Sequence, residues 1–369
     1  MIGLVALFGL AAWTYLLLFH HGFWRADQRL PKQAEPLTTW PSVVAIVPAR
    51  NEAETIAAVA AALCAQDYAG DFRVIIVDDS SSDGTADLAR TAVGHRLDVL
   101  TAPPLPAGWT GKLAALNTGI ATVEVADFLW FTDADIVHPP ETLTHLVAKA
   151  VTDQRDLVSL MVRLRCESFW ERLLIPAFIF FFQMLYPFPA ANSDRSKIAA
   201  AAGGCVLLRR ETLIASGGLE AIRGRIIDDC ALAALIKAAG GKIWLGLADA
   251  STSLRRADTL APLWGMVRRT AYTQLNHSPV TLFFTLLRLA LVFLGPPLAA
   301  WAIMAATYAP TLKDYGRSPW EGWLLPGATL LYGAMTFDSA VAHWRQRGGQ
   351  WKGRNYNPSS DPGNLSKSL

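Results

Sequence analysis

The chain has 369 residues, of which 52% are hydrophobic and 17% are charged, and its mean hydropathy is +0.27. This composition is too apolar for an ordinary soluble enzyme, so the excess is expected in membrane segments. The net charge of +2 excludes the strongly basic character of nucleic-acid-binding proteins, and we expect no nucleic-acid partner. The four cysteines form no C-x-x-C pair, which indicates reduced thiols rather than disulfides or a zinc site.

The N-terminal segment carries no charge between Ile2 and Phe19 and is long enough for a transmembrane helix. A cleaved signal peptide is the alternative. No Lys or Arg precedes the run and no small-x-small cleavage site follows it, which favours a membrane anchor over residues 1–22. Arg25, Arg29 and Lys32 come after the run, so the following domain is predicted to be cytoplasmic.

Strand and helix patterns then alternate along the chain. Strands are expected at 43–47, where Pro48 breaks the run, and at 73–77, 97–100 and 128–132, with helices at 54–64 and from 85 to about 93. This alternation predicts an α/β fold in which helices cover both faces of a mostly parallel sheet. In such folds ligands bind beyond the carboxyl ends of the strands.

Polar side chains follow three of these strands. Asp133 and Asp135 come directly after the strand at 128–132, and carboxylates in this position can hold Mg²⁺ or Mn²⁺. An Asp-x-Asp pair alone is more typical of a solvated turn than of a metal site. Two further clusters, at 50–52 and 78–79, follow their strands in the same way, so together they predict a ligand site at this edge of the sheet.

Two helix starts carry further candidate residues. Gly111 and Lys112 open a helix predicted from Leu113 to Val123, where backbone N–H groups and the ammonium can bind phosphate. The glycine spacing excludes a Walker loop, and a glycine turn with a solvated lysine is the alternative. Asp228 and Asp229 precede a helix predicted at 231–239, either as ordinary helix-dipole partners or with a catalytic base facing a pocket.

The second half of the chain contains three more apolar segments. Residues 173–191 include three prolines and are interpreted either as a segment in the membrane interface or as a buried core helix. Residues 280–306 and 324–342 are predicted as two further transmembrane spans, with Arg288 and Asp338 paired within them. The tail at 344–369 is expected to be disordered and cytoplasmic.

Five blocks of the sequence, in their order and spacing, resemble the membrane-anchored family 2 glycosyltransferases. They are IVPARNE at 46–52, VDDSSSDGT at 77–85, GKLAALNTG at 111–119, DAD at 133–135 and DD at 228–229. Through PLPAGWTGK at 104–112 and RTAYTQL at 269–275, the chain is most similar to the hopanoid (hopene)-associated glycosyltransferases. Ceramide glucosyltransferases look like more distant relatives.

This resemblance implies a GT-A fold, which is a Rossmann-like nucleotide-diphospho-sugar transferase domain, at residues 40–270. It also implies a nucleotide-diphosphate sugar as donor and a divalent cation, Mg²⁺ or Mn²⁺. The residues that it assigns to the nucleotide pocket are Pro48, Arg50, Glu52 and Asp79. The further roles that it implies are Lys112 at the diphosphate, Asp133 at the ribose or sugar, Asp135 on the metal and Asp229 as catalytic base.

One block departs from the family pattern. Membrane members often carry Gln-x-x-Arg-Trp after the base, whereas the nearest stretch here is WGMVRRT at 264–270, without the Gln and the Trp at the matching places.

The predicted function is inverting transfer of a sugar to a membrane lipid acceptor, with a hopanoid as the implied acceptor. The predicted location is the inner (cell) membrane of a bacterial-type cell, with a multi-pass chain, two spans at 280–343 and a cytoplasmic catalytic domain. A processive polysaccharide synthase is one alternative, although two spans after the domain are few for a polymer channel. A catalytically silent sugar-nucleotide-binding scaffold of a lipid-synthesis complex is the other.

Overall fold

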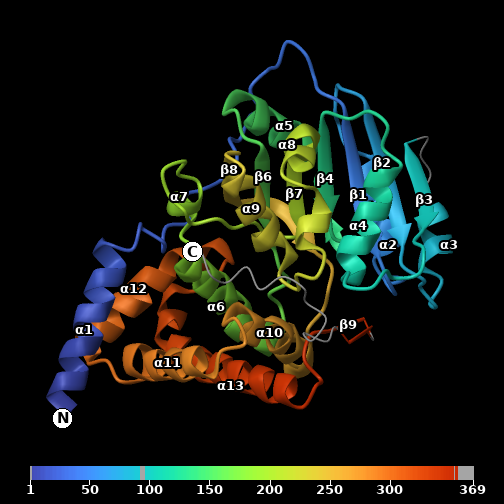
Figure 1. Ribbon diagram of the computed structural model, residues 1–369. Helices are drawn as coiled ribbons and strands as arrows, with labels where there is room; N and C mark the ends of the chain where they lie inside the picture. The colour runs from blue at the N-terminus through green and yellow to red at the C-terminus, as the bar shows by residue number, and fades with distance from the viewer. Residues whose placement is uncertain (1, 92–95, 353, 356–369) are drawn as a thin grey trace. The chain divides into compact units, whose positions relative to one another are not determined.

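The computed structural model describes residues 2–91, 96–352 and 354–355, and the chain divides into two compact units (Figure 1). Unit 1 consists of Met1–Gln28, Leu164–Ile198 and Arg256–Asn355. Unit 2 includes Arg29–Arg163 and Ala199–Arg255. Most of the tail for which disorder was predicted lies outside the described residues.

Unit 2 is built on an eight-stranded sheet with the strand order β3-β2-β1-β4-β7-β6-β8-β5. Strands β3, β2, β1 and β4 run parallel, β7 is antiparallel to both of its neighbours, and β6 is parallel to β8. The mostly parallel α/β sheet that the sequence predicts is thereby confirmed. The strands are β1 (Val43–Ala49), β2 (Phe72–Asp78), β3 (Leu97–Thr101), β4 (Phe128–Thr132), β5 (Ile136–Val137), β6 (Leu157–Arg163), β7 (Cys205–Arg209) and β8 (Ile243–Ser253).

Strand β1 continues through Pro48, where the sequence predicts a break. All seven of its residues are buried, and Pro48 lies opposite Val77 of β2. The pairing between β1 and β4 ends at Ile46, so the proline lies past the last β1–β4 pair. A residue without an N–H group is tolerated at such a place in a strand.

Helix α4 packs closely on the parallel strands of unit 2. A Cβ atom on Gly119 of α4 would lie 2.5 Å from Cγ2 of Ile46 in β1, so only glycine allows this approach. Leu113 and Leu116 of the same helix join Ile46 in one buried cluster. The helices of unit 2 are α2 (Ile56–Cys64), α3 (Thr85–Arg90), α4 (Gly111–Ala121), α5 (Thr142–Thr152), α8 (Arg210–Ala215), η1 (Leu219–Ile222) and α9 (Asp228–Ala238).

Unit 1 is helical except for a short hairpin, and α6 is its most buried long helix. Helix α6 (Phe169–Leu185) buries Leu174, Ile175 and Phe180 among the other helices, so the buried-core alternative applies to this part of 173–191. The remaining elements are α1 (Ile2–Leu18), α7 (Phe188–Ala191), α10 (Leu260–Gln274), α11 (Pro279–Leu289), η2 (Ala290–Leu294), α12 (Leu298–Asp314), η3 (Pro319–Leu324), α13 (Leu325–Trp344), β9 (Gln350–Trp351) and β10 (Arg354–Asn355).

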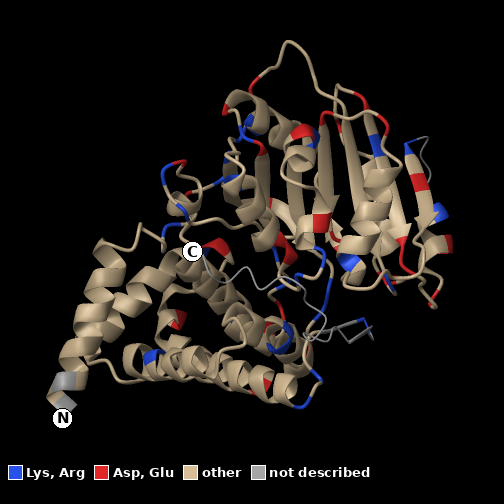
Figure 2. Ribbon diagram, viewed as in Figure 1, with Lys and Arg blue, Asp and Glu red and all other residues tan. Residues whose placement is uncertain are grey.

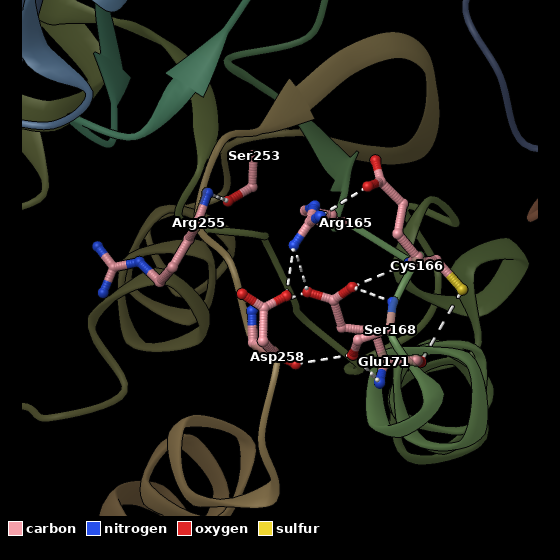
Figure 3. A network of polar contacts seen from close by, with 9 residues as sticks. Arg165, Cys166, Ser168, Glu171, Ser253, Arg255 and Asp258 are labelled. Carbon is pink, nitrogen blue, oxygen red and sulfur yellow. Dashed lines mark hydrogen bonds and ion pairs between the residues drawn. The ribbon is translucent and has the colours of Figure 1, made fainter.

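The first turn of α6 is held by a buried carboxylate, Glu171, whose contacts are drawn in Figure 3. Its two oxygens accept hydrogen bonds from the backbone N–H groups of Glu167 and Ser168, both at 2.9 Å, and of Ala257 at 2.7 Å. Arg165 Nη1 lies 3.5 Å from the same carboxylate. Burial acts to raise the pKa of Glu171, but these N–H groups and Arg165 outweigh it and lower the pKa. The carboxylate therefore ties the chain before α6 to the chain before α10.

The predicted transmembrane spans are not found as such. Among the described residues, no single helix is both long and apolar enough to cross a membrane. The segment predicted to span at 280–306 breaks at Pro296 and Pro297, and its two arms, Pro279–Leu294 and Leu298–Asp314, meet at 101°. Helices α1, α11, α12 and α13 nevertheless carry few charged residues (Figure 2).

The ion pair predicted between Arg288 and Asp338 is wrong. Asp338 of α13 accepts a hydrogen bond from Trp264 Nε1 at 2.8 Å, and its Oδ2 lies 3.2 Å from Arg268 Nε. Both partners belong to α10, in the WGMVRRT stretch that stands nearest to the missing Gln-x-x-Arg-Trp block.

Candidate active site

The loops after β1 and β2 interlock at the carboxyl edge of the sheet. The backbone N–H of Asn51 donates to Ser81 Oγ at 2.9 Å, and Asn51 Oδ1 accepts from the backbone N–H of Ser82 at 2.9 Å. The N–H of Glu52 donates to Thr85 Oγ1 at 2.8 Å. Asn51 and Ser80 adopt positive φ angles of 49° and 54°, which few residues tolerate, so these turns are held by the hydrogen bonds around them.

Two of the predicted pocket residues, Arg50 and Asp79, meet at these loops. Arg50 donates to the carbonyl oxygen of Asp79, and its Nη1 lies 3.9 Å from Asp79 Oδ2. The neighbouring Asp78 is buried and accepts from the backbone N–H of Ser81 at 3.2 Å through Oδ2. Within the described part of the chain, its Oδ1 is buried without a hydrogen-bond partner.

The two carboxylates of the Asp-x-Asp motif contact two different cations of the chain. Asp133 Oδ1 lies 2.8 Å from Lys112 Nζ at the start of α4. Asp135 Oδ2 accepts from Ser253 Oγ at 2.8 Å and from Arg255 Nε at 3.2 Å. Lys112 is therefore not the solvated lysine of the alternative interpretation.

Helix α9 starts at Asp228, three residues before the predicted start at 231, so the acidic pair forms its first turn near Lys112. Asp228 Oδ2 lies 3.4 Å from Lys112 Nζ. Asp229 Oδ2 accepts from the backbone N–H of Gly203 at 2.9 Å. A Cβ atom on Gly203 would lie 2.9 Å from Lys112 Nζ and 3.3 Å from Asp229 Oδ2, so the lack of a side chain here allows the two groups to come together.

Burial and the neighbouring charges shift the pKa values of Asp229 and Lys112. Burial, with the neighbouring Asp228 charge, raises the pKa of Asp229 to about 6, although Lys112 acts in the opposite direction. Burial lowers the pKa of Lys112, but Asp133 and Asp228 outweigh it and raise the pKa. Lys112 is therefore a permanent cation, while Asp229 is a carboxylate that is more basic than usual and can accept a proton near neutral pH.

The buried His138 supports the strands beneath this site. Its Nε2 lies 2.8 Å from Thr132 Oγ1 at the end of β4, and its Nδ1 lies 2.9 Å from Ser251 Oγ in β8. Burial lowers the pKa of His138 to about 3, so the ring is neutral at physiological pH. A lone histidine before two prolines carries no signal of burial, so this contact could not be predicted from local sequence.

The predicted site residues thus fall into three groups at one edge of unit 2. Arg50 meets Asp79, Glu52 and Asp135 share Arg255, and Lys112 joins Asp133 to the start of α9. Pro48 lies inside β1. The sequence patterns did not point to one further residue of the site, Arg255, and they indicated no more than a close backbone approach at Gly203.

The fit of a divalent cation depends on the oxygens around Asp135. Among the described residues, no three His, Cys, Asp or Glu side chains are grouped to hold a metal on their own. Mg²⁺ usually needs only one or two carboxylates when substrate phosphates complete its shell. Asp135 and Glu52 both contact Arg255, and carboxylates outnumber cations across the site. This donor set fits a cation that binds together with a diphosphate.

A parallel sheet with an Asp-x-Asp pair, a lysine and an acidic helix start at its carboxyl edge defines a glycosyltransferase domain of the GT-A type. Residues 44–216 match the family described as Glycosyl transferase family 2, so this part of the chain is a family 2 domain.

Solved and curated proteins show the same likeness. A mannosyltransferase from Pyrobaculum calidifontis, solved in complex with GDP-Man and Mn²⁺, has 20% sequence identity and a TM-score of 0.59, with 93% of this chain and 98% of that chain covered. At this identity the likeness shows the fold alone. An N-acetylglucosaminyltransferase of Mesorhizobium japonicum is 27% identical over 50% of this chain and 42% of its own length.

Two further relatives have names that include a lipid. A beta-monoglucosyldiacylglycerol synthase of Synechocystis is 29% identical over 37% of this chain and 34% of its own length. An undecaprenyl-phosphate 4-deoxy-4-formamido-L-arabinose transferase of Aeromonas hydrophila is 31% identical over 35% of this chain and 40% of its own length. The chain spans less than half the length of these curated relatives.

Proposed function

We propose that this protein transfers a sugar from a nucleotide-diphosphate donor to the hydroxyl of a membrane lipid, with inversion at the anomeric carbon. The observation that carries the proposal is that Asp229 and Lys112 both lie next to Gly203 at the carboxyl edge of the sheet. Asp229 can take up a proton there, while Lys112 can stabilise the negative charge of the leaving diphosphate. The acceptor that we propose is a hopanoid, on the basis of the sequence resemblance.

Each residue of the site has a role in this reaction. Asp229, kept in place by the N–H groups of Gly203 and Cys230, removes the proton from the acceptor hydroxyl as that oxygen attacks the anomeric carbon. Lys112, held by Asp133 and Asp228, stabilises the charge that builds on the leaving diphosphate. Direct displacement with one base inverts the anomeric configuration. A divalent cation on Asp135 would supply further positive charge to the diphosphate.

The nucleotide half of the donor is proposed to lie over the loops after β1 and β2. Arg50 is fixed on the Asp79 backbone there and presents a guanidinium suited to phosphate or base oxygens. The unpaired Asp78 Oδ1 can accept an N–H donor from the base. Asp133, beside Lys112, is proposed to contact the ribose or the sugar.

The lipid acceptor is proposed to reach the protein through unit 1. Helix α11 exposes Val280, Phe283, Phe284 and Leu287, which lie at i, i+3, i+4 and i+7 and so form one apolar stripe. The opposite side of α11 packs inside the unit through Leu282 and Leu286. A helix with an exposed apolar stripe fits the membrane interface, where it can lie without crossing the bilayer. This membrane face supports a lipid acceptor, in agreement with the two relatives whose names include a lipid.

The test is the Asp229→Asn variant of the full chain, assayed with radiolabelled UDP-glucose, UDP-N-acetylglucosamine and GDP-mannose in turn, each with a membrane lipid extract. We expect label in a lipid carrying one sugar, and a loss of about 10²–10⁴-fold in rate in the variant, with unchanged affinity for the nucleoside diphosphate. Because the pKa of Asp229 is about 6, the wild-type rate should fall as the pH drops below that value.

Each other outcome contradicts a separate part of the proposal. Wild-type turnover by Asp229→Asn would assign the proton to another base, and Asp228→Asn is the matched variant for that case. A labelled polymer would indicate a processive synthase. Nucleotide binding without transfer in any lipid extract would indicate a silent binding protein.

A further inference from the structure

The guanidinium of Arg255 bridges two carboxylates of the donor site. Its Nε donates to Asp135 Oδ2 at 3.2 Å, and its Nη2 donates to Glu52 Oε1 at 3.0 Å. The carboxylates lie at the ends of different strands and are nearly buried, with side chains 11% and 12% exposed. A positive charge of the chain therefore occupies the oxygens around which a divalent cation would bind.

The backbone next to Arg255 is anchored, whereas its side chain is half-exposed. Ser253 pairs with Ile136 in the sheet, and the N–H of Leu254 donates to the carbonyl oxygen of Asp135 at 2.8 Å. The Arg255 side chain is 53% exposed, against 21% for Lys112 and 17% for Arg50. Its Nη1 has no hydrogen-bond partner among the residues that the structure describes. The guanidinium can thus leave Asp135 by rotation of its own side chain.

A guanidinium and a divalent cation compete for the same carboxylate, because each is attracted to the oxygens and repels the other. A diphosphate changes this competition. Its oxygens accept two N–H groups of one guanidinium in a bidentate arrangement, as a carboxylate does. An arginine that is bound to a carboxylate can therefore exchange this partner for a diphosphate. Arrival of the donor therefore offers Arg255 a new anion while it also offers the metal new oxygen ligands.

We propose that Arg255 occupies Asp135 in the donor-free site and moves to the diphosphate when the nucleotide binds, so that the divalent cation binds tightly only together with the nucleotide. The inference rests on the donor and cation sites of the proposed function. It adds a positive coupling between the two ligands, with Arg255 as the exchanging group. Arg255 is a positioning residue for the cation and a direct contact of the diphosphate.

The test is a titration of the full chain with Mn²⁺ alone, with free Mn²⁺ followed by electron paramagnetic resonance. Arg255→Ala should bind Mn²⁺ about tenfold or more tightly than wild type, because a single charge at this distance shifts a carboxylate equilibrium by about one to three pKa units. Arg256→Ala is the matched control, since it removes the same charge from the adjacent exposed residue and should bind Mn²⁺ like wild type. Addition of UDP or GDP should strengthen Mn²⁺ binding more in wild type than in Arg255→Ala.

Two further variants make the result decisive. Arg255→Gln keeps the polar side chain and should show the same gain, which covers the case in which the alanine variant does not fold. Arg255→Ala combined with Asp135→Asn should lose the gain. Unchanged or weaker Mn²⁺ binding by the folded Arg255 variants overturns the proposal, as does a gain that survives Asp135→Asn. Sugar transfer is not part of this measurement, so its outcome is independent of the Asp229 test.

Discussion

The neutral state of His138 makes the stability of unit 2 dependent on pH in a way that can be calculated. Burial lowers the pKa of this ring from an ordinary 6.5 to about 3. Between these values the unfolded chain binds a proton that the folded chain does not, so the free energy of unfolding falls as the pH falls. The slope is about 1.4 kcal/mol per pH unit, and the contribution of His138 drops by about 2 kcal/mol between pH 7.5 and pH 5.

The variant His138→Gln isolates this effect, because glutamine keeps polar contacts with Thr132 and Ser251 but does not titrate. Urea unfolding followed by tryptophan fluorescence gives the free energy of unfolding of both proteins at pH 7.5 and pH 5. The advantage of wild type over the variant should shrink by about 2 kcal/mol at the lower pH. An equal difference at the two pH values would refute the argument. The comparison removes the contribution of Asp229, whose raised pKa has the opposite sign and is common to both proteins.

Two more substitutions test contacts described above. Gly203→Ala should lower the transfer rate and displace Lys112 or Asp229, because the added Cβ would lie 2.9 Å from Lys112 Nζ. The pH dependence of the transfer rate of the variant measures this change. Gly265→Ala is the control, because its added Cβ meets no atom within 4 Å. A normal rate and profile in Gly203→Ala would show that the site adapts. Glu171→Gln should lower the free energy of unfolding by about 2–3 kcal/mol, because a buried charged acceptor of three backbone N–H groups becomes neutral. Urea denaturation measures the loss, the exposed Glu167→Gln is the comparison, and equal stabilities would contradict the role of the Glu171 contacts in unit 1.

The sheet and most of the candidate site could be predicted because both depend on local sequence patterns. The buried strand before Asp133 and the apolar run before Asp78 each end in polar residues, and parallel strands bring such ends to one edge. The presence of α9 was predictable for the same reason, from an acidic pair before an apolar helix, although the helix begins at Asp228 rather than at 231. Local signals of this kind hold irrespective of the rest of the fold.

Contacts between distant segments could not be predicted in the same way. Arg255 lies 120 residues after Asp135, and nothing in its neighbourhood indicates a carboxylate partner. Asp338 was assigned to Arg288 on the basis of membrane depth alone, whereas the packing of α10 against α13 presents Arg268 instead. Hydropathy averaged over 280–306 suggests one span, because an average carries no information on the direction that the chain takes after Pro296 and Pro297.

The junction at Ser159 and Ala202 has a consequence for the modular design of the enzyme. Ser159 of β6 and Ala202, which lies just before the antiparallel strand β7, exchange hydrogen bonds through Ser159 Oγ, at 2.8 Å from the backbone nitrogen and 3.2 Å from the carbonyl oxygen of Ala202. The segment that contains α6 leaves the sheet after β6 and returns just before β7, in the place where a simpler protein would have a hairpin turn. The helices of this segment can therefore be exchanged by grafting at this point, with the register of the unit 2 sheet preserved.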